Sequence, residues 1–229
     1  MLLSIIIPTY NEERTLVEVI SKIIKKENIA KEILVIDDGS KDNSIKVLEN
    51  NFKDKIILIK NKKNYGKGYS VRQGLSKCNG DLILIQDADL EYDPDDYEKL
   101  LKPIIDGKAD VVFGSRFRGD GARRQIYFLN QIGNNLISFV CNLFTGLNLS
   151  DIEAGYKVFK SQVIKDIKLR ENRFGFEPEV VVKCSKKNIR IFEVGISYYG
   201  RTYTEGKKIR WYHALQALWC IFIYSLFSK

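Results

Sequence analysis

Acidic side chains follow an apolar stretch in the middle of the chain. Leu82-Ile83-Leu84-Ile85 runs directly into Gln86-Asp87-Ala88-Asp89-Leu90-Glu91. Carboxylates at alternate positions of an emerging strand can project to one side, so Asp87, Asp89 and Glu91 could surround a hard divalent cation such as Mg²⁺ or Mn²⁺. Such an ion would bridge the two phosphates of a nucleoside diphosphate and neutralise charge on a departing group. The alternative is that these three acids lie in a solvated turn.

Polar residues also follow two earlier apolar stretches. Val35-Ile36 leads into Asp37-Asp38-Gly39-Ser40, where a carboxylate can accept hydrogen bonds from a base N–H or a ribose hydroxyl. As an alternative, Asp38 would only order a turn or cap a helix. The first stretch is followed by Pro8-Thr9-Tyr10-Asn11-Glu12, where a dinucleotide-binding fold would need GxGxxG. A nicotinamide or flavin cofactor is therefore disfavoured.

Positive charge gathers in two later segments. The cations are Arg116, Arg118, Arg123 and Arg124, and then Arg201, Lys207, Lys208 and Arg210. Arginine forks suit phosphate oxygens, although basic loops are often simply solvated. The segment 201–207 is typical of a flexible lid that closes over a diphosphate.

The order of apolar and amphipathic stretches predicts how these residues are positioned. Strands are expected at 2–8, 33–37, 56–60, 82–87 and 111–114, with helices at 15–26, 42–50, 68–77 and 94–105. This alternation predicts an α/β fold with a mostly parallel central sheet flanked by helices on both faces. Ligands bind such sheets at the carboxyl ends of the strands, which is where the polar residues fall.

The second half of the chain is less regular. Helices are expected at 126–144 and 177–187 and a strand at 189–194, which together would build the acceptor side. The last segment, 211–229, is predicted to be an amphipathic helix appended to a catalytic domain at 1–210. It is too short to span a bilayer. It would be a core helix, a dimer contact or an interfacial anchor on a membrane surface.

Composition excludes several broad classes. The 229 residues are 45% hydrophobic and 29% charged, with a net charge of +8 and only 4 Pro, which excludes disordered and collagen-like chains. The four cysteines form no CxxC pair, so neither a disulfide scaffold nor a zinc site is favoured and a cytoplasmic location fits best. No signal peptide is recognised at the N-terminus. The positive charge suits polyanions in general, but no nucleic-acid-binding signature is present.

Five motifs, in this order and spacing, resemble family 2 glycosyltransferases of the GT-A fold. They are 6–12 (Ile-Ile-Pro-Thr-Tyr-Asn-Glu), 35–40 (Val-Ile-Asp-Asp-Gly-Ser), 64–68 (Asn-Tyr-Gly-Lys-Gly), 87–89 (Asp-Ala-Asp) and 114–116 (Gly-Ser-Arg). They cover roughly the first 120 residues. The chain is most similar to the polyprenyl-phosphate sugar transferases, typified by dolichyl-phosphate mannose synthase.

The resemblance implies a role for each matching residue. The nucleoside would be held by Pro8, Tyr10, Glu12, Ile36 and Asp38. Asp87 and Ala88 would meet the ribose and diphosphate. Asp89 and Glu91 would ligate Mg²⁺ or Mn²⁺, although the mannose synthases carry Gln where this chain has Glu91.

The resemblance also implies roles on the acceptor side. Arg116, Arg201 and Lys207 fall where the subgroup carries phosphate-contacting cations. Asp151 lies where members that act on hydroxyl acceptors often carry a catalytic acid. A hydroxyl nucleophile needs a general base, whereas a lipid monophosphate arrives largely dianionic and does not. Asp151 could therefore be a base or could only order a turn, and Glu177 and Glu179 are weaker candidates.

The predicted activity is an inverting, metal-dependent transfer of a sugar from a GDP- or UDP-sugar to a polyprenyl phosphate, at the cytoplasmic face of a membrane. Asp89, Asp151 and Arg116 are the candidate catalytic residues. One alternative is transfer to a glycan hydroxyl, with Asp151 as the base. Alternatives of another class are a sugar-1-phosphate nucleotidyltransferase and a non-enzymatic nucleic-acid binder. No oligomeric state is predicted.

Overall fold

The computed structural model describes residues 1–119, 123–125, 127–202, 204–206 and 212–227. Within these ranges one mixed sheet of seven strands has the order β3-β2-β1-β4-β6-β5-β7. The strands are β1 (Leu3–Thr9), β2 (Lys31–Asp37), β3 (Ile57–Lys60), β4 (Leu82–Ile85), β5 (Val111–Ser115), β6 (Lys157–Lys160) and β7 (Ile191–Gly195). The helices are α1 (Leu16–Ile24), α2 (Ser44–Phe52), α3 (Lys67–Leu75), α4 (Tyr97–Ile105), α5 (Phe128–Thr145), α6 (Ser161–Lys165), α7 (Phe176–Ser185) and α8 (Tyr212–Phe227), with a 3₁₀ turn at Pro94–Asp96 before α4.

The sheet is parallel except at β6, which confirms the predicted α/β class. β1 pairs in parallel with β2 and β4, β2 with β3, and β5 with β7. β6 lies antiparallel between β4 and β5. Neither β6 nor α6 is predicted from the sequence, because β6 is only four residues long and two of them are lysines.

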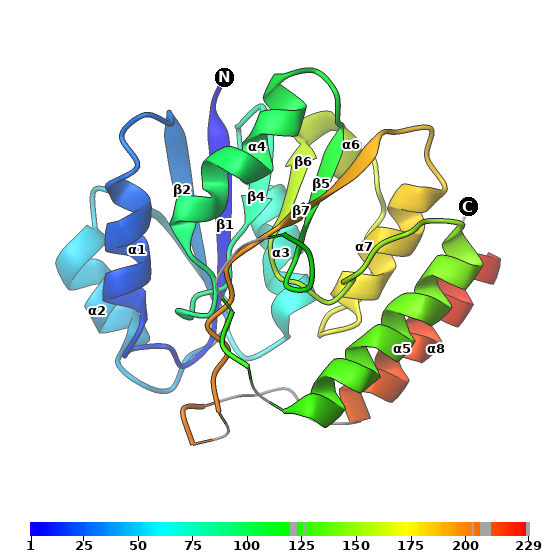
Figure 1. Ribbon diagram of the computed structural model, residues 1–229. Helices are drawn as coiled ribbons and strands as arrows, with labels where there is room; N and C mark the ends of the chain where they lie inside the picture. The colour runs from blue at the N-terminus through cyan, green and yellow to red at the C-terminus, as the bar shows by residue number, and fades with distance from the viewer. Residues whose placement is uncertain (120–122, 126, 203, 207–211, 228–229) are drawn as a thin grey trace.

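Helices cover both faces of the sheet (Figure 1). Successive strand residues face opposite sides, so Ile5 and Ile7 join the core under α1, α2 and α4, while Ile6 joins the core under α3 and α7. The apolar runs 5–7 of β1 and 82–85 of β4 therefore reflect burial on both faces.

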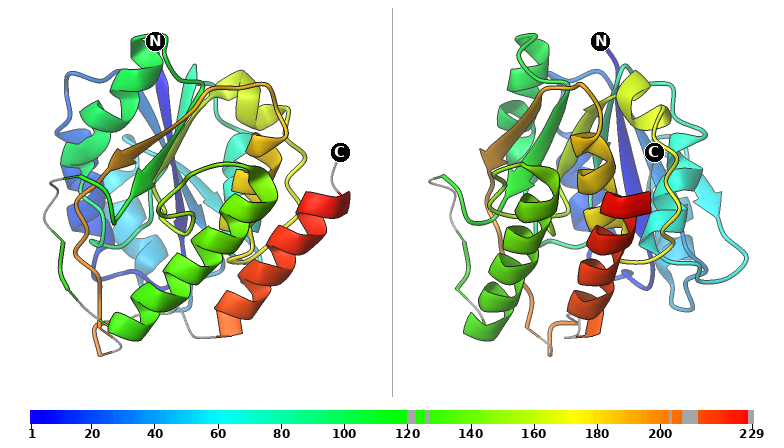
Figure 2. Two further views of the ribbon diagram at one scale, coloured as in Figure 1. Left: turned by 45° about the vertical axis from the view of Figure 1, so that its right-hand side comes forward. Right: turned by 90° about the vertical axis from the view of Figure 1, so that its right-hand side faces the viewer.

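Helices α5 and α8 form an outer layer over α7. They lie side by side and run in the same direction, as both views of Figure 2 show. α8 corresponds to the predicted C-terminal helix. Among the described residues no helix is long and apolar enough to cross a membrane.

Candidate active site

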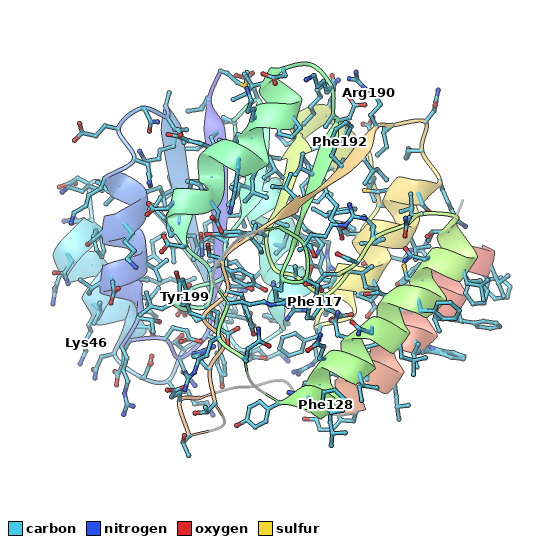
Figure 3. The ribbon with its side chains drawn as sticks, viewed as in Figure 1. Lys46, Phe117, Phe128, Arg190, Phe192 and Tyr199 are labelled. Atoms are coloured by element: carbon cyan, nitrogen blue, oxygen red, sulfur yellow. The ribbon has the colours of Figure 1, made fainter. Side chains whose placement is uncertain are left out.

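The polar motifs meet at the carboxyl ends of the parallel strands. Figure 3 places Tyr199, from the segment after β7, and Phe117, from the loop after β5, beside this end of the sheet. The backbone N–H of Tyr199 donates to the carbonyl of Glu91 (2.9 Å), which joins the segment after β7 to the acidic segment after β4.

The three acids after β4 do not share one partner. Asp87 Oδ1 lies 2.6 Å from the Nζ of Lys67, at the first position of α3. Its second oxygen lies where a side chain at Gly155 would be, since a Cβ there would be only 2.2 Å from Asp87 Oδ2. Asp89 and Glu91 instead turn toward Arg201.

Arg201 is the cation on which the remaining acids converge. Its guanidinium reaches Asp89 Oδ2 at 2.6 Å and Glu12 Oε2 at 3.2 Å. Its backbone N–H donates to Glu91 Oε1 at 2.8 Å. Carboxylates this close repel one another unless a cation or solvent lies between them, and in this structure the guanidinium and backbone N–H of Arg201 relieve the repulsion.

The Asp89 carboxyl is strongly perturbed. Burial, reinforced by the carboxylates of Glu91 and Asp87 and opposed by Arg201, raises the pKa of Asp89 to about 8. A carboxylate held at such a raised pKa gains from any further cation that approaches it.

The carboxylate groups around Arg201 have the chemistry of ligands for a hard divalent cation, but in this structure they are not arranged as a metal site. Carboxylate oxygens are the ligands that Mg²⁺ and Mn²⁺ prefer, and the guanidinium of Arg201 stands in for a cation among Glu12, Asp89 and Glu91. In the described part of the chain, no three acidic, His or Cys side chains are grouped closely enough to hold a metal ion. Arg201 would therefore have to move for Asp89 and Glu91 to ligate one.

Residues predicted to contact the nucleoside differ in how accessible they are. Asp38 is buried, and its carboxylate accepts hydrogen bonds from the Asn61 amide and from the N–H groups of Tyr65 and Gly66. It orders the 61–66 loop. The Ile36 side chain is fully buried in the core under α3, so it is not exposed at the site.

The remaining donor-side residues lie around this loop cluster. Ala88 is buried in the core under α1 and α4, while Pro8 and Tyr10 are partly exposed. Lys207, predicted to contact phosphate, lies outside the described residues.

Arg116 and Asp151 form a buried pair on the other side of the site. Asp151 Oδ2 accepts from the backbone N–H (3.0 Å) and Nε (2.7 Å) of Arg116, and Oδ1 accepts from its Nη2 (2.8 Å) and from Asn134 Nδ2 (3.3 Å). Burial alone would raise the pKa of Asp151, but Arg116 outweighs it and the pKa lies below its ordinary value. A carboxylate engaged on both oxygens and hard to protonate is poorly suited to act as a base.

The segment 150–157 is held from several elements. Glu193 Oε1 on β7 accepts from the N–H groups of Ser150 (2.7 Å) and Asp151 (3.2 Å). The hydroxyl of Tyr92 accepts from the N–H of Gly155 (2.9 Å). This backbone is therefore fixed beside the acids after β4.

Glu153 in this segment gives a stability prediction. Its Oε1 is a buried acceptor without a hydrogen-bond donor among the described residues, and burial, then Glu177, raises its pKa from 4.5 to about 7. Because the folded-state pKa exceeds the unfolded one, the folded protein binds more protons between pH 4.5 and 7, and stability falls as the pH rises through that window. We expect Glu153→Gln to unfold with a free energy about 3 kcal/mol higher than wild type at pH 8, and equal to it near pH 4.5.

Urea denaturation at several pH values checks this expectation. Glu18→Gln, which removes an exposed carboxylate paired with Lys22 on α1, serves as the control and should not alter the pH dependence. A Glu153→Gln variant that is equally destabilised at pH 5 and pH 8 would contradict the assignment.

A family model for glycosyl transferase family 2 matches residues 4–168. The chain belongs to this family. It is therefore a glycosyltransferase that uses a nucleotide-sugar donor, and the nucleotidyltransferase and nucleic-acid-binding alternatives fall away. The residues of the family match include every donor-side motif and the Arg116–Asp151 pair.

Two relatives match most of this chain. The UDP-N-acetylglucosamine–dolichyl-phosphate N-acetylglucosaminyltransferase of Methanococcus voltae is 30% identical over 214 residues, which cover 85% of this chain and 84% of that protein. The glycosyltransferase AglJ of Haloferax volcanii is 33% identical over 198 residues, covering 86% of this chain and 63% of that longer protein.

Solved structures confirm the GT-A fold. Glucosyl-3-phosphoglycerate synthase from Mycobacterium tuberculosis, solved with Mn²⁺, UDP and phosphoglyceric acid, has a TM-score of 0.76 at 16% identity, covering 97% of this chain and 78% of that chain. The same enzyme with Mg²⁺ and UDP has a TM-score of 0.73 at 15% identity, covering 99% and 80%.

Three charged residues at the site were not predicted to act there. Lys67 falls within the Asn-Tyr-Gly-Lys-Gly motif, so its position was indicated but not its contact with Asp87. Lys157 and Glu193 carry no sequence signal, because their partners come from elements far apart in the chain.

Proposed function

We propose that this family 2 enzyme transfers a sugar, with inversion, from a GDP- or UDP-sugar to a polyprenyl phosphate at the cytoplasmic face of a membrane. The observation that carries the lipid acceptor is an exposed apolar face on two neighbouring helices next to the acceptor side of the site. The Methanococcus voltae relative, whose name states UDP-N-acetylglucosamine as donor and dolichyl phosphate as acceptor, supports the same class.

On the donor side, the residues around the carboxyl ends of β1, β2 and β4 would bind the nucleotide. Pro8, Tyr10 and Glu12 would contact the nucleoside, and Asp38 would act by ordering the loop that closes on it. Because its side chain is buried, Ile36 would contact the nucleoside only through its backbone. Asp87 and Ala88 would lie against the ribose and diphosphate.

A divalent cation held by Asp89 and Glu91, with Asp87 nearby, would neutralise the charge of the leaving diphosphate. Arg201 would leave these acids and donate hydrogen bonds to the phosphate oxygens. Lys207 would also donate to the phosphate oxygens. The Mn²⁺- and Mg²⁺-bound structures with the same fold support this choice of ions.

On the acceptor side, the geometry favours a phosphate nucleophile. Asp151 has both oxygens engaged and a lowered pKa, so it would hold Arg116 in place for the lipid phosphate. A largely dianionic phosphate needs no base to remove a proton. A glycan hydroxyl would need one, and this arrangement gives that alternative no support.

Two stripes of apolar side chains form the exposed face, called here the two-helix apolar face. In each helix the residues are alternately three and four positions apart, the spacing of a single helical stripe. Its members are Leu129, Ile132, Leu136, Phe139 and Leu143 of α5, and Tyr212, Leu215, Trp219, Phe222 and Leu226 of α8, all exposed. Neither helix contains an Asp, Glu, Lys or Arg.

The surroundings of this face match a membrane surface. Arg123 and Arg124 precede α5, and Lys207-Lys208-Ile209-Arg210 precedes α8, so cations come before both helices in the sequence. Both starts lie at the end of the molecule that holds the site (Figure 1). Apolar faces flanked by cations lie in the interface of anionic membranes. We therefore propose that the membrane-binding unit comprises α5 as well as segment 211–229, beyond the appended helix expected from sequence.

Vesicle flotation gives a prediction for this face. Phe139 and Trp219 are 66% and 63% exposed, so the double substitution Phe139→Glu/Trp219→Glu should leave the fold intact and lower binding to anionic liposomes at least about tenfold. Phe192→Glu is the matched control, since Phe192 is also exposed but lies on β7, away from α5 and α8 (Figure 3). Equal flotation of the double variant and wild type would remove the membrane assignment.

Product extraction tests the transfer itself. The protein is incubated with radiolabelled GDP- and UDP-sugars, Mn²⁺ and a polyprenyl phosphate, and the expected label appears in the organic phase. Label that appears only in a water-soluble glycan would replace the lipid acceptor by the hydroxyl acceptor.

A further inference from the structure

A buried row of four alternating charges runs behind the acidic segment. Lys67 Nζ lies 2.6 Å from Asp87 Oδ1 and 2.7 Å from Glu177 Oε1, the latter an ion pair without hydrogen-bond alignment. The other oxygen of Glu177 accepts from Lys157 Nζ. The four residues come from the segment after β4, the start of α3, the start of α7 and the start of β6.

The far end of this row reaches the acceptor side. Besides Glu177, the ammonium of Lys157 donates to the backbone carbonyls of Ile152 (3.3 Å) and Ala154. An ammonium has three protons to donate, so Lys157 is fully used. These carbonyls lie one and three residues after Asp151, which holds Arg116.

The charges depend on one another because they are buried. The side chains of Lys157 and Glu177 are 1% and 4% exposed, while those of Lys67 and Asp87 are 15% and 22% exposed. Burial by itself lowers the pKa of Lys67, but Asp87 and Glu177 more than offset this effect, and its pKa lies above the ordinary value. Removing one member would leave an uncompensated buried charge, which is strongly unfavourable.

We propose that Glu177 is a positioning residue shared by the two halves of the site. Through Lys67 it fixes the Asp87 carboxylate on the donor side, and through Lys157 it fixes the backbone at 152–154 on the acceptor side. The names donor and acceptor rest on the proposed function, while the coupling concerns this chain alone. Because Lys67 neutralises Asp87, this arrangement also leaves Asp89 and Glu91 as the acids free to exchange Arg201 for another cation.

The chain offers a matched control on the same helix. Glu179 is fully buried, pairs with Lys183, and accepts from the N–H groups of Arg170 and Glu171. It contacts neither the acidic segment nor the segment 150–157. A purely structural role for Glu177 would make Glu177→Gln and Glu179→Gln behave alike.

Hydrogen exchange on the full-length chain tests the coupling, because it reports local opening of each segment separately. We expect Glu177→Gln to speed exchange in both 87–91 and 152–157 by about tenfold or more, and Lys157→Met to do so only in 152–157. Glu179→Gln should change neither. Glu177→Asp, which keeps the charge, should restore much of the protection. If Glu177→Gln does not fold, Lys67→Met, which should speed exchange only in 87–91, and Lys157→Met test the two arms separately.

Binding of UDP and of GDP, each with Mn²⁺, to the same proteins adds a functional readout. Glu177→Gln should weaken it about tenfold, within the usual range for coupled sites, while Lys157→Met and Glu179→Gln should bind as wild type does. Exchange that rises in only one segment of Glu177→Gln, or equally in Glu179→Gln, would overturn the proposal. A wild-type protein that binds no nucleotide would instead overturn the proposed function, and the exchange result would still decide the coupling.

Discussion

Replacing Asp89 by Asn should lower the rate of sugar transfer at least about 10³-fold, because a metal ligand and the charge it contributes are lost at the leaving diphosphate. Stabilising that charge is worth several kcal/mol, and each 1.36 kcal/mol is about tenfold in rate. The same substitution should not destabilise the fold. Burial and the neighbouring carboxylates raise the pKa of Asp89 to about 8, so its charged form is disfavoured in the folded protein, and the removal of that charge by Asn offsets the loss of the pair with Arg201.

Initial rates and thermal unfolding of Asp89→Asn at pH 7 check both parts. Asp95→Asn is the control, because Asp95 lies in the same connection between β4 and α4 but is 77% exposed and pairs only with Lys26 among the described residues. It should transfer sugar at the wild-type rate. An Asp89→Asn variant that is active within about tenfold of wild type would exclude a metal role for this carboxylate.

Replacing Asp151 by Asn should produce the opposite pattern, with a large loss of stability and a small loss of activity. Arg116 would keep its burial and lose its counterion, and breaking a buried pair in this way costs about 3–5 kcal/mol. Asn still presents an oxygen to the guanidinium, so transfer to a lipid phosphate should fall only about tenfold, less than the 10²–10⁴-fold contribution typical of a general base. Urea denaturation measures the loss of stability, and transfer rates at low temperature, where the variant stays folded, measure the loss of activity.

The control for Asp151 is Asp110→Asn at the opposite end of the sheet. Asp110 also binds an arginine, Arg190, together with Lys160, but these two side chains are 53% and 27% exposed, so Asp110→Asn should lose less stability than Asp151→Asn. If a folded Asp151→Asn protein transferred sugar about 10³-fold or more slowly than wild type, Asp151 would be assigned as a general base and the acceptor would be a hydroxyl group.

The parallel strands and the position of the site could be predicted because both are local signals. Apolar runs buried on both faces mark β1, β2 and β4, and polar residues directly after a run must lie at its carboxyl end. β6 could not be predicted in this way, because it is not a continuous apolar run. Its two lysines are tolerated because Lys157 pairs with Glu177 and Lys160 with Asp110, and neither partner is near in sequence.

The roles of individual charges were harder to predict, since they depend on which distant residue arrives. Arg201 was expected to contact the diphosphate, and in this structure its guanidinium pairs with Asp89 and Glu12. Asp38 was expected either to contact the nucleoside or to order a turn, and it holds the 61–66 loop. The apolar residues of α5 would by composition alone be assigned to the core, and only the packing of α5 beside α8 leaves one stripe of each exposed.

Calorimetric titration of UDP and GDP into the wild-type protein, once with Mn²⁺ and once with EDTA, tests the central claim most directly. Asp89 and Glu91 contact Arg201 and would exchange it for the metal ion, so the nucleotide should bind at least about tenfold more tightly with Mn²⁺ than with EDTA. Equal affinity in the two titrations, for whichever nucleotide binds, would contradict a cation-dependent grip on the diphosphate.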